Sequence, residues 1–359
     1  MRILAVRLRQ IGDVVFTTPT LGALRSHFQD AFISYLVEPA AAPVVQGHPA
    51  IDELIVAPRG RGLAGLRAEW ALIRRLRARK FDLVLDFHGG PRASVLTWLS
   101  GAPRRIGYEV VGRAWMYTTR VPRARDLRPR HSVENQWDLL HALGIPPPDP
   151  TRHPVTMAAP ADTAGVVGAR LAAAGVDQSA RLIVIHVSAG NPFRRWPIPA
   201  FAEVAARLAA DDGAHRVLVT AGPSERDAAA RVIETARSHL PPDQMGRVLA
   251  CGEFSLDELR ALVDRAALFI GGDSGPMHIA ATSRVPVVGL YGPTLPARSR
   301  PWRDPTWPAE AVEVADLPCR PCEQRVCVPG DFRCLTWIRP DHVIDAARRA
   351  LGETGRLSR

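Results

Sequence analysis

The stretch LFIGGDSGPMH, residues 268–278, is the part of the sequence that decides the fold. Its first three residues are apolar and predict a buried strand, while Pro276 is a residue type that commonly begins a helix. The small residues between them permit a tight turn, and the free backbone N–H groups at a helix N-terminus suit a phosphate. The stretch therefore predicts a strand, a ligand-binding loop and a helix in succession.

The same alternation of short apolar runs and helix-like segments continues through most of the chain. In the first half we predict strands at 3–6, 32–37, 54–56, 83–87 and 105–108, with helices at about 14–28, 62–79 and 92–100. In the second half we predict strands at 182–187, 216–220, 247–250, 268–270 and 285–290, with helices at about 199–210, 224–238, 256–266, 275–283 and 340–351. Strands rich in Val, Ile and Leu between helices are typical of parallel sheets covered on both faces.

A proline-rich break at about 144–162 divides the chain into two similar α/β halves. We expect Rossmann-like doubly wound domains over 1–150 and 151–338, and a C-terminal helix and tail, 339–359, that packs back on the N-terminal domain. Ligands of doubly wound folds bind outside the carboxyl ends of the strands. We therefore expect the two domains to face a central crevice that holds the chemistry.

Charge is distributed unevenly over the 359 residues, whose formal net charge is +10. Residues 1–150 hold 21 basic and 13 acidic side chains, and residues 151–359 hold 25 basic and 23 acidic ones. This excess predicts an anionic partner for the first half. Nucleic acid is disfavoured, because aromatic residues make up only 6% and are not interleaved with the basic ones. Without a signal peptide or a bilayer-length apolar run, we expect a cytoplasmic protein.

Two further strand-end loops carry candidate functional groups. Asp13 follows Gly12 directly after the first strand, where its carboxylate either caps a helix or accepts a proton from a substrate hydroxyl. The loop after residues 182–187 holds Ser188, Arg194 and Arg195, whose donors suit a diphosphate. The alternative for the two arginines is a solvated pair beside a buried tryptophan.

Four cysteines, Cys319, Cys322, Cys327 and Cys334, follow the pattern C-x2-C-x4-C-x6-C. Only the first spacing fits a typical zinc site, so free or redox-labile thiols are one interpretation and a structural Zn or Fe–S site is the other. The segment lies outside the predicted strand-end loops. We therefore expect it to have no catalytic role.

The helix predicted at 62–79 has a regular apolar pattern. Leu63, Leu66, Trp70, Ile73 and Leu76 recur at helical spacing with arginines between them. This pattern predicts an amphipathic surface helix.

Five motifs, in order along residues 1–351, together resemble one known family. They are ILAV at 3–6, IGDV at 11–14, RRWP at 194–197, GDSGPMH at 272–278 and PVVGLYGPT at 286–294. The set resembles the bacterial lipopolysaccharide heptosyltransferases, glycosyltransferase family 9. The resemblance implies a GT-B architecture and inverting transfer of heptose from ADP-heptose to the lipopolysaccharide inner core, with no cofactor needed for the chemistry.

The resemblance also implies roles for individual residues. Asp13 is implied as the general base, and Arg194 stands where the family commonly has a lysine beside the donor diphosphate. Asp257 falls at the position of a ribose-binding acid, and Asp273 matches the residue facing the donor sugar. The residues expected to bind the donor are Ser188, Arg194, Arg195, Asp257, Asp273, Ser274, Gly275, Pro276, Met277 and His278.

A family acceptor is a phosphorylated glycolipid of the inner leaflet, which gives the basic first half a use. We expect acceptor contacts from Gly12, Arg61, Arg104, Arg105 and Arg120, and peripheral attachment at the cytoplasmic face of the inner membrane. Two alternatives stay open. One is a GT-B transferase for another sugar nucleotide or acceptor, and the other is a non-catalytic nucleotide-binding protein of the same fold.

Overall fold

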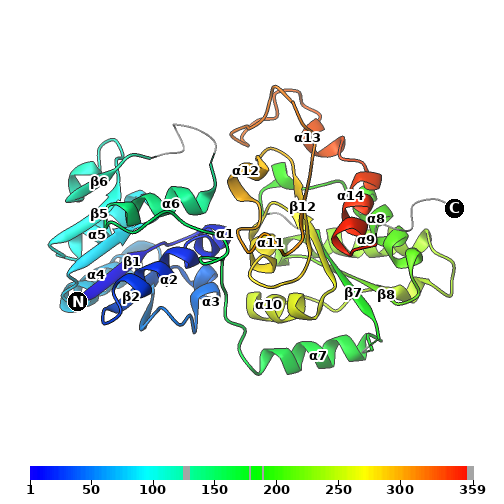
Figure 1. Ribbon diagram of the computed structural model, residues 1–359, viewed down its shortest axis with the longest axis horizontal. Helices are drawn as coiled ribbons and strands as arrows, with labels where there is room; N and C mark the ends of the chain where they lie inside the picture. The colour runs from blue at the N-terminus through cyan, green and yellow to red at the C-terminus, as the bar shows by residue number, and fades with distance from the viewer. Residues whose placement is uncertain (124–129, 178, 188–189, 354–359) are drawn as a thin grey trace. The chain divides into compact units, whose positions relative to one another are not determined.

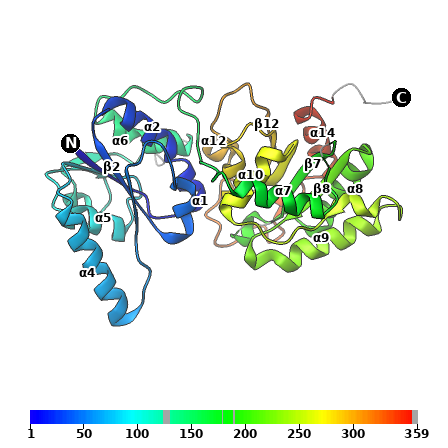
Figure 2. The same cartoon turned by 90° about the horizontal axis from the view of Figure 1, so that it is seen from below.

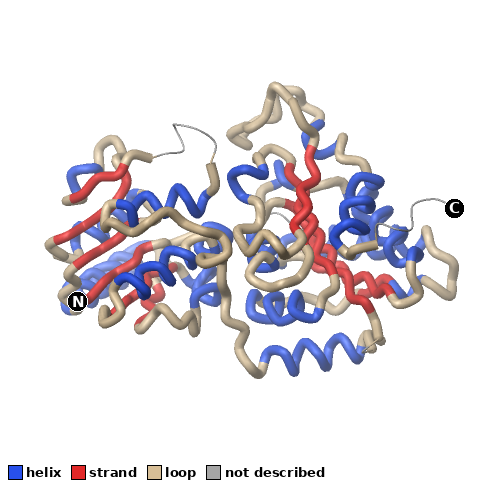
Figure 3. The backbone as a smooth tube through the Cα atoms, in the orientation of Figure 1, coloured by secondary structure: helices blue, strands red, loops and turns tan. Residues whose placement is uncertain are grey.

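A computed structural model describes residues 1–123, 130–177, 179–187 and 190–353. The chain forms two compact units, Met1–Ala158 with Trp302–Asp304, and Ala159–Pro301 with Pro305–Arg359. Each unit is built on a parallel sheet with helices on both faces (Figures 1 and 3). Among the described helices, none combines the length and hydropathy that a bilayer crossing needs.

The first unit has the strand order β3-β2-β1-β4-β5-β6, which is the Rossmann order. Its strands are β1 (Arg2–Val6), β2 (Phe32–Val37), β3 (Glu53–Val56), β4 (Leu83–Asp86), β5 (Arg104–Tyr108) and β6 (Thr119–Val121). Its helices are α1 (Ile11–Val15), α2 (Thr18–His27), α3 (Ala42–Val45), α4 (Gly62–Ala78), α5 (Pro91–Leu99) and α6 (Ser132–His141). The central strand β1 is apolar because it is buried on both faces, and Ala5 pairs with Tyr35 on one side and Leu85 on the other.

Helix α4 is amphipathic as predicted, but its apolar stripe is buried along only part of the helix. Leu72, Ile73 and Leu76 pack into a core with β1 and β4. By contrast, Leu63 is 76%, Leu66 60% and Trp70 61% exposed. Figure 2 shows the helix extending away from the sheet of its own unit.

The second unit repeats the Rossmann order as β12-β11-β10-β7-β8-β9. Its strands are β7 (Arg181–His186), β8 (His215–Thr220), β9 (Val248–Leu249), β10 (Leu268–Gly272), β11 (Val287–Tyr291) and β12 (Ala309–Glu313). Its helices are α7 (Thr163–Ala173), α8 (Ile198–Asp211), α9 (Arg226–Ser238), α10 (Leu256–Arg265), α11 (Gly275–Ala280), α12 (Pro296–Ser299), α13 (Arg333–Thr336) and α14 (Pro340–Ala350). Since all strands are parallel, the loops after β7, β9 and β10 emerge at one edge of this sheet.

The C-terminal helix α14 belongs to the second unit. Val343, Ile344 and Ala347 are fully buried in the same core as the residues of α8 and β11. The indole N–H of Trp196 donates to the carbonyl of Ile338, just before this helix, at 3.1 Å. Our expectation that the helix packs on the N-terminal domain is therefore wrong, because its apolar face completes the core of the second unit.

The unit boundary at Ala158 falls inside the predicted break, but a short return segment was not expected. Trp302–Asp304 joins the first unit. The indole N–H of Trp302 donates to the carbonyl of His153 at 2.9 Å, and its ring lies 4.7 Å from that of His131. The segment has no periodic pattern, because isolated contacts hold it, including a backbone hydrogen bond from Val155 to Trp302, and it forms no helix or strand.

Candidate active site

Asp13 lies at the carboxyl edge of the first sheet, in the first turn of α1. The N-cap residue is Gln10, and no side chain caps this helix, so capping does not explain the aspartate. Its carboxylate instead pairs with the guanidinium of Arg7 at 2.5 Å and is 38% exposed, while Arg7 is 12% exposed. Arg7 also donates to the carbonyl of Phe87 after β4. A carboxylate held in this way is oriented yet open to a substrate hydroxyl.

A cavity of about 630 Å³ opens at the same edge of the first sheet. It is lined by Arg9, Glu38, Pro58, Arg59, Gly60, Arg61, Gly65, Glu69 and Arg92. Glu38 pairs with Arg59 at 2.5 Å and with Arg92 at 3.2 Å. Within the described residues, no ion pair engages Arg9 or Arg61, and both are exposed. With four arginines and two glutamates, the cavity suits an anionic group.

The glycines of this cavity are needed for packing. A Cβ atom on Gly65 would lie 2.6 Å from the carbonyl carbon of Gly60. Only glycine therefore permits the loop after β3 to lie against the first turn of α4.

The structure brings some of the predicted acceptor residues to this edge and leaves others elsewhere. Gly12 lies in α1 beside Asp13, and Arg61 lines the cavity. Arg104 and Arg105 begin β5, at the opposite edge of the sheet, and Arg105 donates to the carbonyls of Met116 and Ala102. Arg120 is in the middle of β6, paired with Gly107. The structure therefore supports only Gly12 and Arg61 as neighbours of Asp13 along the carboxyl edge.

In the second unit, Asp273 is the centre of a polar network directly after β10. It is 2% exposed. The Arg194 guanidinium donates to its backbone carbonyl at 2.9 Å and to Oδ2 at 3.2 Å, and the Thr294 hydroxyl donates to Oδ2 at 2.6 Å. His278 Nε2 lies 3.3 Å from Oδ1. Burial would raise the pKa of Asp273, but His278, Arg194 and Thr294 outweigh it and lower the pKa to about 2.

Two residues that the sequence did not single out hold this network in place. Oε1 of Gln324 accepts hydrogen bonds from Nε of Arg194 at 2.7 Å and from Nδ2 of Asn191 at 2.9 Å. Arg320, whose side chain is 3% exposed, donates to the carbonyl of Thr294 at 2.6 Å. Both lie in the cysteine-rich segment, so this segment supports the Asp273 network from one side.

The remaining predicted donor residues differ in their surroundings. Ser274 is the N-cap of α11, Gly275 and Pro276 form its first turn, and all three are half-buried. Met277 is fully buried, with its sulfur 3.8 Å from the hydroxyl of Tyr291, so it packs in the core. Arg195 pairs with the buried carboxylate of Glu225 at 2.6 Å.

Asp257 and Ser188 are the last two residues that we expected to bind the donor. Asp257 lies in the first turn of α10, where burial, helped by Asp162 and Glu258, raises its pKa. Ser188 lies outside the described residues.

The four cysteines of the segment all line one apolar cavity of about 410 Å³, together with Phe193, Val326 and Phe332. All four are free thiols. Within the described ranges, no three His, Cys, Asp or Glu side chains are grouped closely enough to hold a metal ion. The structure gives the Zn or Fe–S interpretation no support.

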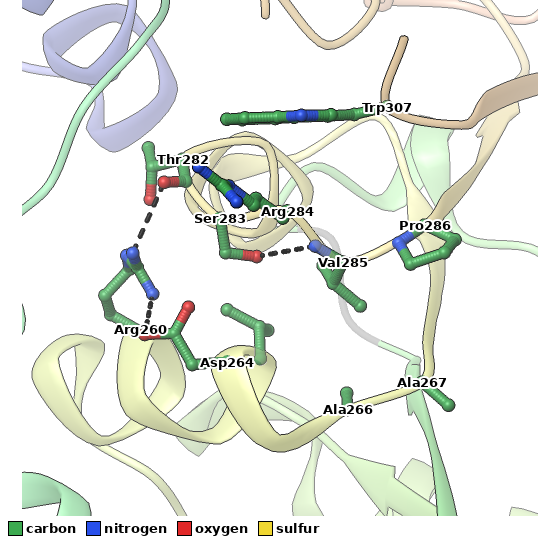
Figure 4. A pocket seen from close by; sticks show the side chains of 11 residues that line it. Arg260, Asp264, Ala266, Ala267, Thr282, Ser283, Arg284, Val285, Pro286 and Trp307 are labelled. Carbon is green, nitrogen blue, oxygen red and sulfur yellow. Dashed lines mark hydrogen bonds and ion pairs between the residues drawn. The ribbon is translucent and has the colours of Figure 1, made fainter. Parts of the chain in front are cut away.

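A third cavity, of about 610 Å³, lies at the amino ends of β10 and β11. Figure 4 shows the Trp307 ring above Arg284, whose guanidinium carbon is 5.5 Å from the ring centroid. Arg260 donates to the carbonyl of Thr282 at 3.3 Å and pairs with Asp264. This cavity lies at the edge of the sheet opposite Asp273 and is therefore separate from the candidate site.

Comparison with known proteins identifies a set of relatives. A family model described as glycosyltransferase family 9 (heptosyltransferase) matches residues 69–332. The chain is 30% identical to lipopolysaccharide heptosyltransferase 3 of Escherichia coli K12 over 354 residues, which cover 96% of this chain and 97% of that protein.

Solved structures agree. A family 9 glycosyl transferase from Veillonella parvula is 26% identical, with a TM-score of 0.84 over 98% of this chain and 97% of that one. The Escherichia coli ADP-heptose lipopolysaccharide heptosyltransferase II is 19% identical, with a TM-score of 0.78 over 99% of each chain. The predicted architecture of two Rossmann-like domains is confirmed.

Proposed function

Because the chain belongs to glycosyltransferase family 9, the heptosyltransferases, it is a glycosyltransferase, and we propose that it transfers a heptose from ADP-heptose to the inner core of lipopolysaccharide. Lipopolysaccharide is the acceptor in the name of the relative that matches 96% of the chain, and ADP-heptose is the donor in the name of the structural neighbour with TM-score 0.78. The inner core is what the family resemblance implies. The observation that carries the proposal is the pair of strand-end sites, Asp13 with Arg7 and Asp273 with Arg194.

We assign the acceptor hydroxyl to Asp13. In an inverting transfer, the carboxylate takes the hydroxyl proton while the oxygen forms a bond to the anomeric carbon, and the bond from that carbon to the diphosphate breaks. The pairing with Arg7 supports this assignment, since it fixes the orientation of the carboxylate while leaving 38% of the side chain exposed.

We assign the donor diphosphate to the loops around Asp273. The leaving ADP takes the electron pair of the broken bond and gains negative charge, which fixed cations stabilise. Arg194 supplies that charge beside the helix that begins at Gly275. Arg194 replaces the lysine common in the family. Its guanidinium keeps the positive charge for the diphosphate and at the same time donates to Asp273 and Gln324, which changes the geometry of the contact.

The cavity that contains Arg9 and Arg61 is our candidate site for the phosphate or carboxylate groups of the acceptor. Such groups are abundant in the lipopolysaccharide inner core that the resemblance implies. Peripheral attachment at the cytoplasmic face of the inner membrane is part of the same proposal, because the acceptor is a membrane glycolipid.

The decisive experiment is a transfer assay with purified protein. ADP-heptose and inner-core lipopolysaccharide that lacks the added heptose are expected to yield ADP and an acceptor heavier by one heptose, as seen by mass spectrometry. UDP and GDP sugars are run in parallel. Turnover with one of these alone would replace the donor assignment, while ADP binding without turnover on any acceptor would favour the non-catalytic alternative.

We expect the transfer to proceed without a cofactor, so a chelator should leave the rate unchanged. A structural metal at the four cysteines remains a prediction of their spacing alone. Metal analysis and an absorption spectrum of the purified protein test it.

A further inference from the structure

The first half of α4 exposes an apolar stripe that its own unit does not cover. Leu63, Leu66 and Trp70 are separated by three and four residues, so they lie on one face of the helix, and each is at least 60% exposed. The helix is anchored farther along by Leu72, Ile73 and Leu76, which are buried. Large apolar side chains exposed together on one helix face mark an interaction surface.

Positive charge surrounds this stripe. Residues 59–80 contain eight basic side chains and one acidic side chain, Glu69. Arg67 adjoins Leu66, and Arg74 continues the exposed face one turn after Trp70; both arginines are exposed. Leucine and tryptophan bordered by arginine are the pattern of a helix that lies in a membrane interface, with its apolar side chains in the headgroup region and its cations beside lipid phosphates.

The position of the stripe suits this role. The helix extends away from the sheet of the first unit (Figure 2). On another side of the same turns, Gly65 and Glu69 line the arginine-rich cavity. A lipid surface that contacts Leu63, Leu66 and Trp70 would therefore lie within one helix diameter of the cavity assigned to the acceptor's anionic groups.

We propose that Leu63, Leu66 and Trp70, with Arg67 and Arg74, dock the protein on an anionic lipid surface. This docking surface gives the glycosyltransferase access to a membrane-bound acceptor, and in that purpose it rests on the proposed function. Lipid binding itself needs no turnover, so the two can be tested separately.

The test is sedimentation of the full chain with vesicles. We expect binding to phosphatidylcholine vesicles that contain 30% phosphatidylglycerol, and weaker binding to pure phosphatidylcholine. A triple variant, Leu63→Gln, Leu66→Gln and Trp70→Gln, should lower the apparent partition coefficient about tenfold or more. The single variant Trp70→Gln should show part of that loss. The matched control is Val111→Gln with Trp337→Gln, because these side chains are also exposed, by 98% and 52%, but lie outside the stripe.

Activity separates this inference from the proposed function. The triple variant should transfer sugar to a delipidated acceptor as the wild type does, and should lose rate only on acceptor in vesicles. Equal sedimentation of the wild type and the triple variant would overturn the inference. So would a wild-type dimer that the triple variant converts to monomer, since a second copy would then cover the stripe. Vesicle binding without any sugar transfer would overturn the proposed function alone.

Discussion

Nε of Arg194 donates a hydrogen bond of 2.7 Å to Oε1 of Gln324, which joins the loop after β7 to the cysteine-rich segment 130 residues later. The same oxygen accepts a hydrogen bond from Nδ2 of Asn191 at 2.9 Å. The side chain of Gln324 therefore holds both Asn191, which precedes the short turn Pro192–Arg194, and Arg194, which ends it. Gln324 thus positions the cation that we assign to the donor diphosphate.

Gln324→Ala should weaken donor binding, because Arg194 loses the partner that holds its guanidinium. A hydrogen bond to a charged group contributes about 1.5–3 kcal/mol, of which part should appear as a three- to tenfold higher KM for ADP-heptose with a smaller change in kcat. Calorimetry with ADP checks the binding step. The control is Glu323→Ala, whose side chain is 83% exposed. A fall in kcat with unchanged KM would contradict a positioning role in donor binding.

The adjacent arginines should respond differently to substitution. Arg194→Ala should reduce ADP affinity at least tenfold, and Arg194→Lys should recover part of it, since the charge returns without the planar fork. Arg195→Ala should leave ADP affinity unchanged and lower the melting temperature, because the carboxylate of Glu225, which is 5% exposed, loses its cationic partner. Calorimetry and thermal unfolding of all three variants check this. Equal losses of ADP affinity would mean that both arginines contact the donor.

Asp13→Asn should abolish transfer and spare donor binding. Removing a general base costs about 10²–10⁴-fold in rate, and the amide keeps the size of the side chain. The measurement is kcat with saturating ADP-heptose, together with the ADP dissociation constant. Asp30→Asn, at an exposed position outside the edge that holds Asp13, is the matched control. Turnover within a few fold of the wild type would remove Asp13 from the mechanism.

Much of the fold could be predicted because it depends on local patterns. The buried strands β1, β7 and β10 contain uninterrupted apolar runs at 3–6, 182–185 and 268–270, and such runs are visible in the sequence without any knowledge of the fold. Strands β6 and β12 were missed because neither contains an apolar run: β6 has the sequence TRV and β12 the sequence AEAVE.

The candidate site was only partly predictable, for a different reason. Asp13 and Asp273 closely follow predicted strands and can be picked out in the sequence. Arg7, which pairs with Asp13, and Gln324, which holds Arg194, are recognisable only once the chain has folded. For the arginines at 104 and 105 the opposite holds: their charge is evident in the sequence, but strand direction puts them at the opposite edge of the sheet. Exposure of Leu63, Leu66 and Trp70 was equally hidden, because helical periodicity does not say how far a helix extends beyond its core.

Arg61→Gln should raise the KM for acceptor and leave the KM for ADP-heptose unchanged. Arg61 lines the cavity on the carboxyl edge of the first sheet. The loss of one contact to an acceptor anion is expected to raise the KM for acceptor about three- to tenfold. Arg104→Gln is the matched control, because Arg104 is also exposed but begins β5 at the other edge. Initial rates over a range of acceptor concentrations give the result. If both variants raise the KM for acceptor equally, the arginines act through long-range electrostatic attraction and Arg61 does not contact the acceptor in the cavity.

The Asp273 carboxylate should make the free energy of unfolding depend on pH between about 4 and 2. Its pKa falls from an ordinary value near 4 to about 2 in the folded chain, so its contribution is fully present above pH 4 and is lost as pH falls to about 2. At 1.36 kcal/mol per unit, that contribution is about 2 kcal/mol. Urea unfolding of the wild type and Asp273→Asn at several pH values between 6 and 2.5 measures it. The difference in unfolding free energy between the two proteins should shrink by most of that amount as pH falls, while the exposed control Asp345→Asn should show a small difference throughout. A difference that stays constant over the window would mean that the Asp273 carboxylate gains nothing from Arg194, Thr294 and His278 in its ionised form.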